Sequence, residues 1–147
     1  MPQIAQLNVG RVLYPMTDPL MAGFANELDR INALAEASPG FVWRLKDDSG
    51  NATGIQTTDD PAFLVNLSVW ETVASLRAFV YGNEHRTLVA QRRDWFERAD
   101  APILVLWPVA EGHRPTAEEA LAVLARFRAE GPSSSAFDFR TLPAEFR

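Results

Sequence analysis

The sequence predicts an α+β fold with one antiparallel sheet, in which elements follow the order β, α, β, β, α, β before an extra C-terminal helix and tail. Residues 3–9 and 63–70 alternate between two side-chain faces, which indicates strands. Apolar residues spaced by three and four across residues 21–35 indicate an amphipathic helix. A chain of 147 residues can bury the core of one such domain without disulfides.

The first half of the chain is predicted as strand, helix and strand. The strand over residues 3–9 ends before Pro15, and Asp18-Pro19 is typical of a helix start. Ser38-Pro39-Gly40 ends that helix, and residues 41–46 form the second strand before a polar turn.

The second half repeats the pattern and adds a helix. Residues 63–70 form the third strand, followed by helices over residues 71–81 and 84–99 and a fourth strand over residues 103–109. A Thr-x-x-Glu capping box at Thr116 begins a helix that Gly131-Pro132 ends. We expect residues 1–110 to form the main domain, with the helix and phenylalanine-rich tail of residues 111–147 packed on it.

This order is that of the ferredoxin-like split βαβ arrangement. Its two helices can cover only one face of the sheet. We expect the other face to be the partly polar one, and to be covered by the sheet of an identical subunit. The residues expected on that face are Gln6, Asn8, Val42 or Arg44, Asn66, Ser68 and Trp70. The sequence therefore predicts a homodimer.

Composition excludes several classes of function. The net charge is −5, and no basic stretch is interleaved with aromatic residues, which argues against a nucleic-acid or acidic membrane partner. The absence of cysteine excludes disulfides, thiolate nucleophiles, iron–sulfur clusters and Cys-ligated zinc. Because the two histidines are well apart in the sequence, any metal site would have to use carboxylates or a single histidine. Neither a secretory signal nor an apolar run long enough for a bilayer is present, so we expect a cytoplasmic protein.

His85 is the first candidate for chemistry, because it follows a Gly-Asn helix stop and is one of only two histidines. Its ordinary pKa near neutrality suits a general acid or base. A capping or surface residue and an iron ligand are alternatives that the sequence leaves open. His113, which precedes a capping box, is interpreted as structural.

Polar and aromatic side chains on the strands form the second group of candidates. Asn8, Asn66 and Ser68 could hold a ligand oxygen or an enolate, or they could satisfy a buried network or a dimer seam. Trp43 and Trp70 could stack on an aromatic ligand or belong to the core.

The arginines divide into two groups. Arg44, on a strand, could attract a carboxylate or phenolate, or could make a surface ion pair. The four arginines of residues 86–98 resemble an anion-binding cluster, but the i, i+4 spacing of two of them to Glu97 and Asp94 favours a solvated, salt-bridged helix face.

Several segments together resemble a small uncharacterised bacterial family within the dimeric α+β barrel superfamily. These segments are Val69-Trp70-Glu71, Leu76 to Tyr81 with His85, Arg92-Arg93-Asp94-Trp95-Phe96, Leu106-Trp107-Pro108-Val109, Gly112 to Thr116, Gly131-Pro132 and Ala136-Phe137. The resemblance spans nearly the whole chain and implies a dimeric α+β barrel.

That superfamily includes antibiotic-biosynthesis monooxygenases, haem-degrading monooxygenases, muconolactone isomerase and ligand-sensing domains. The resemblance implies a dimer with sheets face to face and a pocket between sheet and helices in each subunit. Asn8 and His85 are similar in position to two residues of the haem-degrading branch. The tryptophan of that branch has no counterpart ahead of His85, since Trp70 lies on the strand.

These observations predict a small-molecule enzyme, either a cofactor-independent monooxygenase or an isomerase/cyclase, acting on an aromatic or polyketide-like substrate. In this hypothesis His85 is the base, while Asn8, Asn66 and Arg44 hold the oxyanion. Ser68, Trp43 and Trp70 would complete the substrate site, and no cofactor or metal is required. The alternatives are a haem-binding protein that uses His85 and a non-catalytic ligand-binding or interaction module.

Overall fold

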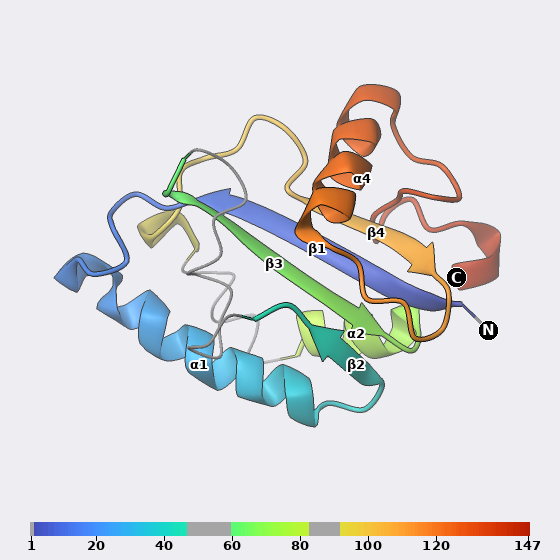
Figure 1. Ribbon diagram of the computed structural model, residues 1–147, viewed down its shortest axis with the longest axis horizontal. Coiled ribbons are helices and arrows are strands. Elements are labelled where there is room, and N and C mark those ends of the chain that lie inside the picture. The colour runs from blue at the N-terminus through green and yellow to red at the C-terminus, as the bar shows by residue number, and fades with distance from the viewer. Residues whose placement is uncertain (1, 47–59, 83–91) are drawn as a thin grey trace.

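The computed structural model describes residues 2–46, 60–82 and 92–147 and confirms the α+β fold (Figure 1). Among these residues, one antiparallel sheet has the order β2-β3-β1-β4. Its strands are β1 (Gln3–Arg11), β2 (Phe41–Arg44), β3 (Phe63–Trp70) and β4 (Leu104–Val109). The central strands β1 and β3 pair along their length, with Ile4 opposite Trp70 and Arg11 opposite Phe63.

Local capping residues set the beginnings of the helices. Asp18 accepts the Leu20 N–H before the short helix η1 (Pro19–Met21), which leads into α1 (Ala22–Ala37). Thr72 and Ser75 form a capping box at α2 (Val73–Val80), and Thr116 caps α4 (Ala117–Glu130). Within the described part of the chain, no helix combines the length and apolar character needed to span a membrane.

The two faces of the sheet are covered differently from the sequence prediction. The apolar face, with Leu7, Leu67 and Val105, packs under α4, which lies in front of the strands in Figure 1. The partly polar face turns toward α1 and α2, since their side chains line one cavity with it. The expectation that a partner's sheet covers the partly polar face is therefore wrong. The apolar stripe of the additional helix α4 also needs a surface to bury, and it takes the apolar face of the sheet.

The predicted helix over residues 84–99 is also corrected in its last part. Residues 83–91 lie outside the described residues, and a short 3-10 helix, η2, spans Arg92–Asp94. Beyond it the chain is extended: Phe96 forms an antiparallel bridge with Val12, and the Glu97 N–H donates to the Arg11 carbonyl at 2.8 Å. The i, i+4 helix pairing expected for Glu97 is replaced by a contact with the end of β1.

The C-terminal tail packs against the edge of β4. Phe137 is fully buried and exchanges two backbone hydrogen bonds with Leu106, of 2.7 and 2.9 Å. Its ring stacks on Phe146 of η3 (Ala144–Phe146) with centroids 5.5 Å apart. The tail therefore extends the edge of β4 and closes one end of the core.

Candidate functional site: a cavity between the sheet and two helices

A cavity of about 710 Å³ lies between the partly polar face of the sheet and helices α1 and α2. We refer to it as the sheet–helix cavity. Its floor is formed by the inward-facing residues of β1 and β3, and helix α1 contributes Phe24, Leu28 and Asn32. A cavity of this size suits a small organic ligand, and its walls are mostly apolar.

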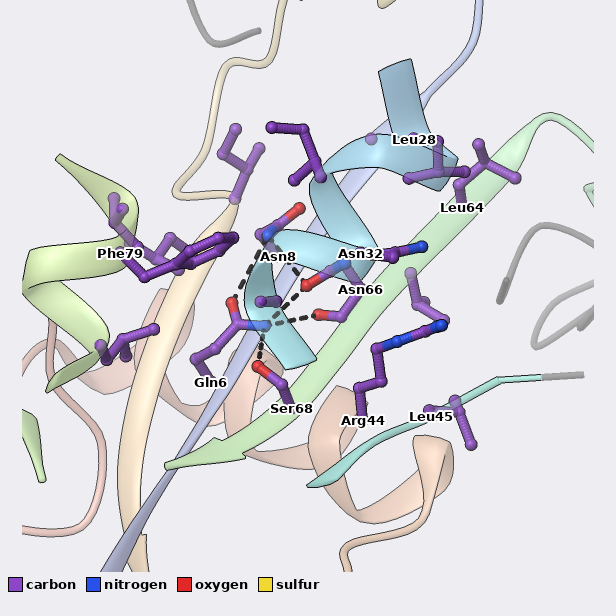
Figure 2. Close-up of a pocket in the computed structure, with 18 of the residues that line it drawn as sticks. Gln6, Asn8, Leu28, Asn32, Arg44, Leu45, Leu64, Asn66, Ser68 and Phe79 are labelled. Carbon is purple, nitrogen blue, oxygen red and sulfur yellow. Dashed lines mark hydrogen bonds between the residues drawn. The ribbon is translucent and has the colours of Figure 1, made fainter. Parts of the chain in front are cut away.

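Four polar side chains form a hydrogen-bonded network on the cavity floor (Figure 2). Gln6 Nε2 donates to Asn66 Oδ1 at 2.7 Å and to Ser68 Oγ at 2.8 Å. Asn8 Nδ2 lies 3.4 Å from Gln6 Oε1 and 3.5 Å from Asn66 Oδ1. The β1–β3 register explains the grouping, because Gln6 is opposite Ser68 and Asn8 is opposite Asn66.

The network leaves specific donors for a ligand. The Asn66 carboxamide oxygen accepts from two neighbouring amides, so its Nδ2–H₂ group is the part that can donate to a bound molecule. Ser68 Oγ accepts from Gln6 and from the Trp70 indole, which leaves the hydroxyl proton of Ser68 to donate. The floor therefore offers hydrogen-bond donors where the walls are apolar.

Aromatic rings form both ends of the cavity. At one end the buried Trp70 ring stacks on Phe79 with centroids 5.3 Å apart and meets the edge of Phe41 at 5.4 Å. At the other end Phe24 contacts Trp95 and Phe96 at 5.5 and 5.1 Å. A flat aromatic ligand between these ends would find ring partners on both sides of the polar floor.

Of the described residues, two arginines line the cavity, and their surroundings differ. Arg44 Nε lies 2.7 Å from Glu36 Oε1, and the Arg44 side chain is only 12% exposed. Arg92 Nη2 donates to the Val9 carbonyl at 3.0 Å, and its guanidinium carbon lies 4.5 Å from the Phe96 centroid. Burial lowers the pKa of Arg92, because the charged form loses hydration.

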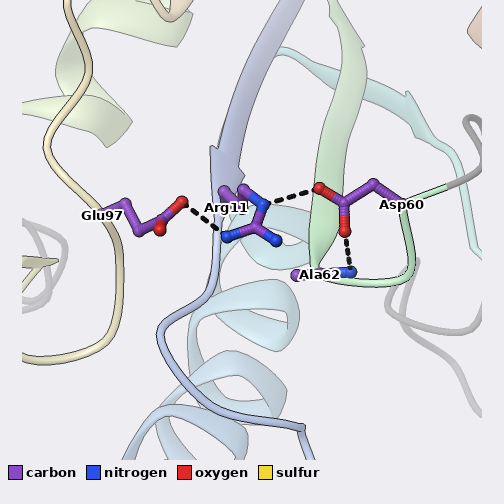
Figure 3. Close-up of polar contacts among 4 residues, drawn as sticks. All are labelled: Arg11, Asp60, Ala62 and Glu97. Atoms are coloured by element: carbon purple, nitrogen blue, oxygen red, sulfur yellow. Dashed lines mark hydrogen bonds and ion pairs between the residues drawn. The ribbon is translucent and has the colours of Figure 1, made fainter.

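A surface cluster links Glu97, in the segment after η2, to the end of β1 (Figure 3). Arg11 bridges two carboxylates, with Nε 2.6 Å from Asp60 Oδ2 and Nη1 2.9 Å from Glu97 Oε2. The hydrogen bond from Arg11, with a second from the Ala62 N–H, lowers the pKa of Asp60, while these carboxylates raise that of Arg11. The cluster joins β1, the start of β3 and the segment after η2.

The structure brings most of the predicted site residues together. Asn8, Asn66, Ser68, Trp70 and Arg44 all line the sheet–helix cavity. These side chains line the same cavity because residues two apart on a strand share a face.

The remaining predicted residues lie elsewhere. Trp43 pairs with Val69 and packs against the core under α4, on the other face of the sheet from the cavity. His85 lies outside the described residues, so its role stays a prediction. His113 is partly exposed and lies 2.9 Å from Glu119, in keeping with a structural role. Among the described ranges, no group of three or more metal-ligating side chains is present.

Two residues of the site were not predicted as functional. Gln6 is the centre of the polar network, and its position two residues before Asn8 was the signal available in the sequence. Arg92 was interpreted as part of a solvated helix face. No local pattern indicated that the chain after η2 turns back along β1.

Comparison with known proteins connects this architecture to a family and a fold. Residues 3–146 match the family described as "Domain of unknown function (DUF3291)". No curated protein matches the chain. A protein of unknown function from Nitrosomonas europaea, NE2512, has a similar structure, with a TM-score of 0.52 and 17% identity over 79% of this chain and 97% of that one.

Two further solved structures carry descriptions of activity. SnoaB, a cofactor-independent oxygenase from Streptomyces nogalater, aligns with a TM-score of 0.50 and 18% identity over 81% of this chain and 100% of its own. A candidate antibiotic biosynthesis monooxygenase from Chloroflexus aurantiacus aligns with a TM-score of 0.50 and 17% identity, over 76% and 97% of the two chains. At these identities the likeness shows a shared fold.

Proposed function

The chain belongs to the DUF3291 family, a domain of unknown function, and we propose that it is a cofactor-independent enzyme acting on a small aromatic or polyketide-like substrate. The observation that carries this proposal is the donor-rich floor of Asn66 and Ser68 between two aromatic ends of one cavity. Fold similarity to a cofactor-independent oxygenase supports the proposal but does not specify the reaction.

The geometry supports a reaction that passes through an enolate. A ligand carbonyl placed over the floor would accept hydrogen bonds from Asn66 Nδ2 and the Ser68 hydroxyl. These donors become stronger partners as negative charge develops on that oxygen, which lowers the barrier to removal of a neighbouring C–H proton. The sequence assigns His85 as the base for this step, and that assignment stays a prediction.

An enolate at this position can continue in two ways without a bound cofactor. Reprotonation or attack on a second carbonyl gives an isomerase or cyclase. Reaction with O₂ gives a monooxygenase: the carbanion forms a C–O bond to O₂, protonation yields a hydroperoxide, and loss of water converts CH₂ to C=O. The overall change, CH₂ + O₂ → C=O + H₂O, takes all four electrons from the substrate carbon, so no external reductant is needed.

The shared proton-removal step can be measured on dithranol, an anthrone with one acidic CH₂ group. Under argon in D₂O, we expect the protein to accelerate deuterium exchange at that CH₂ above the rate in buffer, as followed by mass spectrometry. In air, added O₂ uptake with formation of the anthraquinone identifies the monooxygenase, whereas exchange without extra uptake identifies the isomerase or cyclase.

The variants for this assay come from opposite faces of the sheet. Asn66→Leu keeps the approximate volume but removes the donor, and we expect it to slow the exchange by roughly 10²-fold, as for loss of an oxyanion donor. Trp43→Phe changes the face under α4 and should leave the rate unchanged. An exchange rate equal to that in buffer, or an Asn66→Leu rate equal to wild type, contradicts the proposal.

The haem-binding alternative depends on His85, and the absorption spectrum of added hemin tests it separately. Hemin added to the protein would give a shifted Soret band that is lost in the His85→Ala variant. Since we propose cofactor-independent chemistry, we expect the hemin spectrum to stay unchanged when protein is added.

The homodimer stays a proposal. The position of α4 on the apolar face limits where the sheets of two subunits could pair. Because α4 covers much of the apolar face, sheet-to-sheet pairing would have to use the part near β2, where Val42, Trp43 and Phe63 are only partly buried. Light scattering after size-exclusion chromatography would measure the mass. A mass near 16.3 kDa, that of a single chain, contradicts the homodimer.

A further inference from the structure

The guanidinium group of Arg92 is built into one end of the sheet–helix cavity. One face of the group lies against the Phe96 ring, and Nη2 donates to the Val9 carbonyl. An arginine has five N–H donors in a fixed plane, so within the described part of the chain these contacts leave several donors for a bound molecule. The side chain is half-buried and lines the cavity, which places its charge where water is partly excluded.

The charge of Arg92 is less compensated than that of Arg44. Arg44 has an ion pair with Glu36, whereas the contacts of Arg92 among the described residues are the Val9 carbonyl and the Phe96 ring. The cavity lining within the described part of the chain contains no aspartate or glutamate. A partly desolvated cation in such a lining attracts an anion more strongly than one in water, because the effective dielectric constant is lower.

We propose that Arg92 is the binding site for a carboxylate on the substrate, so that the sheet–helix cavity selects aromatic acids over their neutral analogues. This inference rests on the proposed function, because it takes the polar floor as the site of the reacting carbonyl. It makes Arg92 a specificity-determining residue.

The spacing along β1 gives the shape of the preferred ligand. The guanidinium group of Arg92 lies against Gly10 of β1. Gly10 is two residues from Asn8 and lies on the same face of the strand. Two residues of a strand span roughly 7 Å. Asn66 is opposite Asn8, so a ligand whose carbonyl accepts from Asn66 would reach Arg92 with a carboxylate roughly 7 Å away. Planar Arg–carboxylate contacts of this kind are commonly bidentate.

A matched pair of probes tests this site without knowledge of the natural substrate. 2-Naphthoate and 2-naphthamide share the same rings and differ in charge. By isothermal titration calorimetry at neutral pH and low salt, we expect wild type to bind the naphthoate about tenfold more tightly, since charge-assisted hydrogen bonds are about twice as strong as neutral ones.

Two arginine variants separate a binding role from a general effect of charge. Arg92→Gln should reduce the preference for naphthoate to within about twofold while naphthamide binding changes little. Arg77→Gln is the control, because Arg77 also donates to a backbone carbonyl and lies over a ring, that of Phe139, but does not line the cavity. It should keep the wild-type preference, and Arg92→Lys should keep part of it.

A measurement on wild type alone covers the case in which Arg92→Gln does not fold. Raising the salt from about 20 mM to about 500 mM should weaken naphthoate binding severalfold and leave naphthamide binding unchanged. Equal affinity of wild type for both probes overturns the inference but not the proposed function, and so does a preference that survives in Arg92→Gln. Failure of both probes to bind contradicts the aromatic site itself and, with it, this inference.

Discussion

Arg92 lies directly against Gly10 of strand β1: a Cβ atom at position 10 would be 2.7 Å from the Nη2 atom of Arg92. The same Cβ would lie 2.5 Å from Cδ1 of Phe96, which forms the ring under the guanidinium. Glycine at this position therefore permits the packing of the arginine and its ring on the strand. Gly10 of the central strand β1 therefore provides the space in which Arg92 of the proposed anion site packs.

Replacement of Gly10 by alanine should disturb this end of the cavity. The methyl group requires Arg92 and Phe96 to move, and overpacking of this kind typically costs about 1–3 kcal/mol. We expect Gly10→Ala to lower the free energy of unfolding in urea and to reduce 2-naphthoate binding more than 2-naphthamide binding. Gly23→Ala is the control, since its Cβ would meet Trp95 at an ordinary 3.4 Å. A Gly10→Ala protein with unchanged stability and probe preference would contradict this packing role.

Acid should weaken the surface cluster around Arg11. The hydrogen bond from Arg11 lowers the pKa of Asp60 in the folded state, so the folded protein binds a proton there less readily than the unfolded chain. The stabilisation is present above the unfolded pKa of about 3.9 and is lost as the pH falls through the lower folded value. Urea midpoints at neutral and acidic pH should differ less in Asp60→Asn than in wild type. Equal pH dependence of the two proteins would show that Asp60 does not contribute to the loss of stability in acid.

Removal of the Ser68 hydroxyl should destabilise the cavity floor. Ser68 Oγ accepts hydrogen bonds from Gln6 at 2.8 Å and from Trp70 at 2.9 Å, so Ser68→Ala leaves two buried donors without this acceptor. We expect a loss of about 1–3 kcal/mol in the free energy of unfolding. The exposed Ser134→Ala variant should lie within about 0.5 kcal/mol of wild type. Similar losses in both variants would mean that the network contributes little to stability.

The C-terminal tail should contribute to the stability of the whole domain. Phe137 is fully buried beside β4, so Phe137→Ala should cost about 3–5 kcal/mol and appear in a single unfolding transition. Phe139→Ala, at a half-buried position, should cost less. Two separate transitions for wild type would indicate instead that residues 111–147 unfold independently of the main domain.

Much of the fold could be predicted because its signals are local. The caps at Asp18 and Thr116 stand where helices begin, and a capping residue acts only on the turn that follows it. The choice of cover for each sheet face was not local. It depended on whether α4 or the pair α1 and α2 buries Leu67 and its neighbours, and alternation along a strand says nothing about which helices do so.

The same difference between local and non-local signals applies to the candidate site. Asn66, Ser68 and Trp70 could be grouped because one strand places them on one face, and Asn8 lies beside them because its strand pairs with that one. Arg92 could not be found in this way. Its position depends on an extended segment that contacts β1 through Phe96, in a stretch whose sequence favours a helix.

The indole signals of the four tryptophans provide the most direct test of the sheet–helix cavity as a ligand site. Trp70 and Trp95 line the cavity, whereas Trp43 and Trp107 pack in the core under α4. In nitrogen-15 NMR spectra, with signals assigned by Trp→Phe variants, titration with 2-naphthoate should shift the Trp70 and Trp95 indole peaks and leave the other two in place. Shifts confined to Trp43 and Trp107, or no shifts at all, would contradict the account.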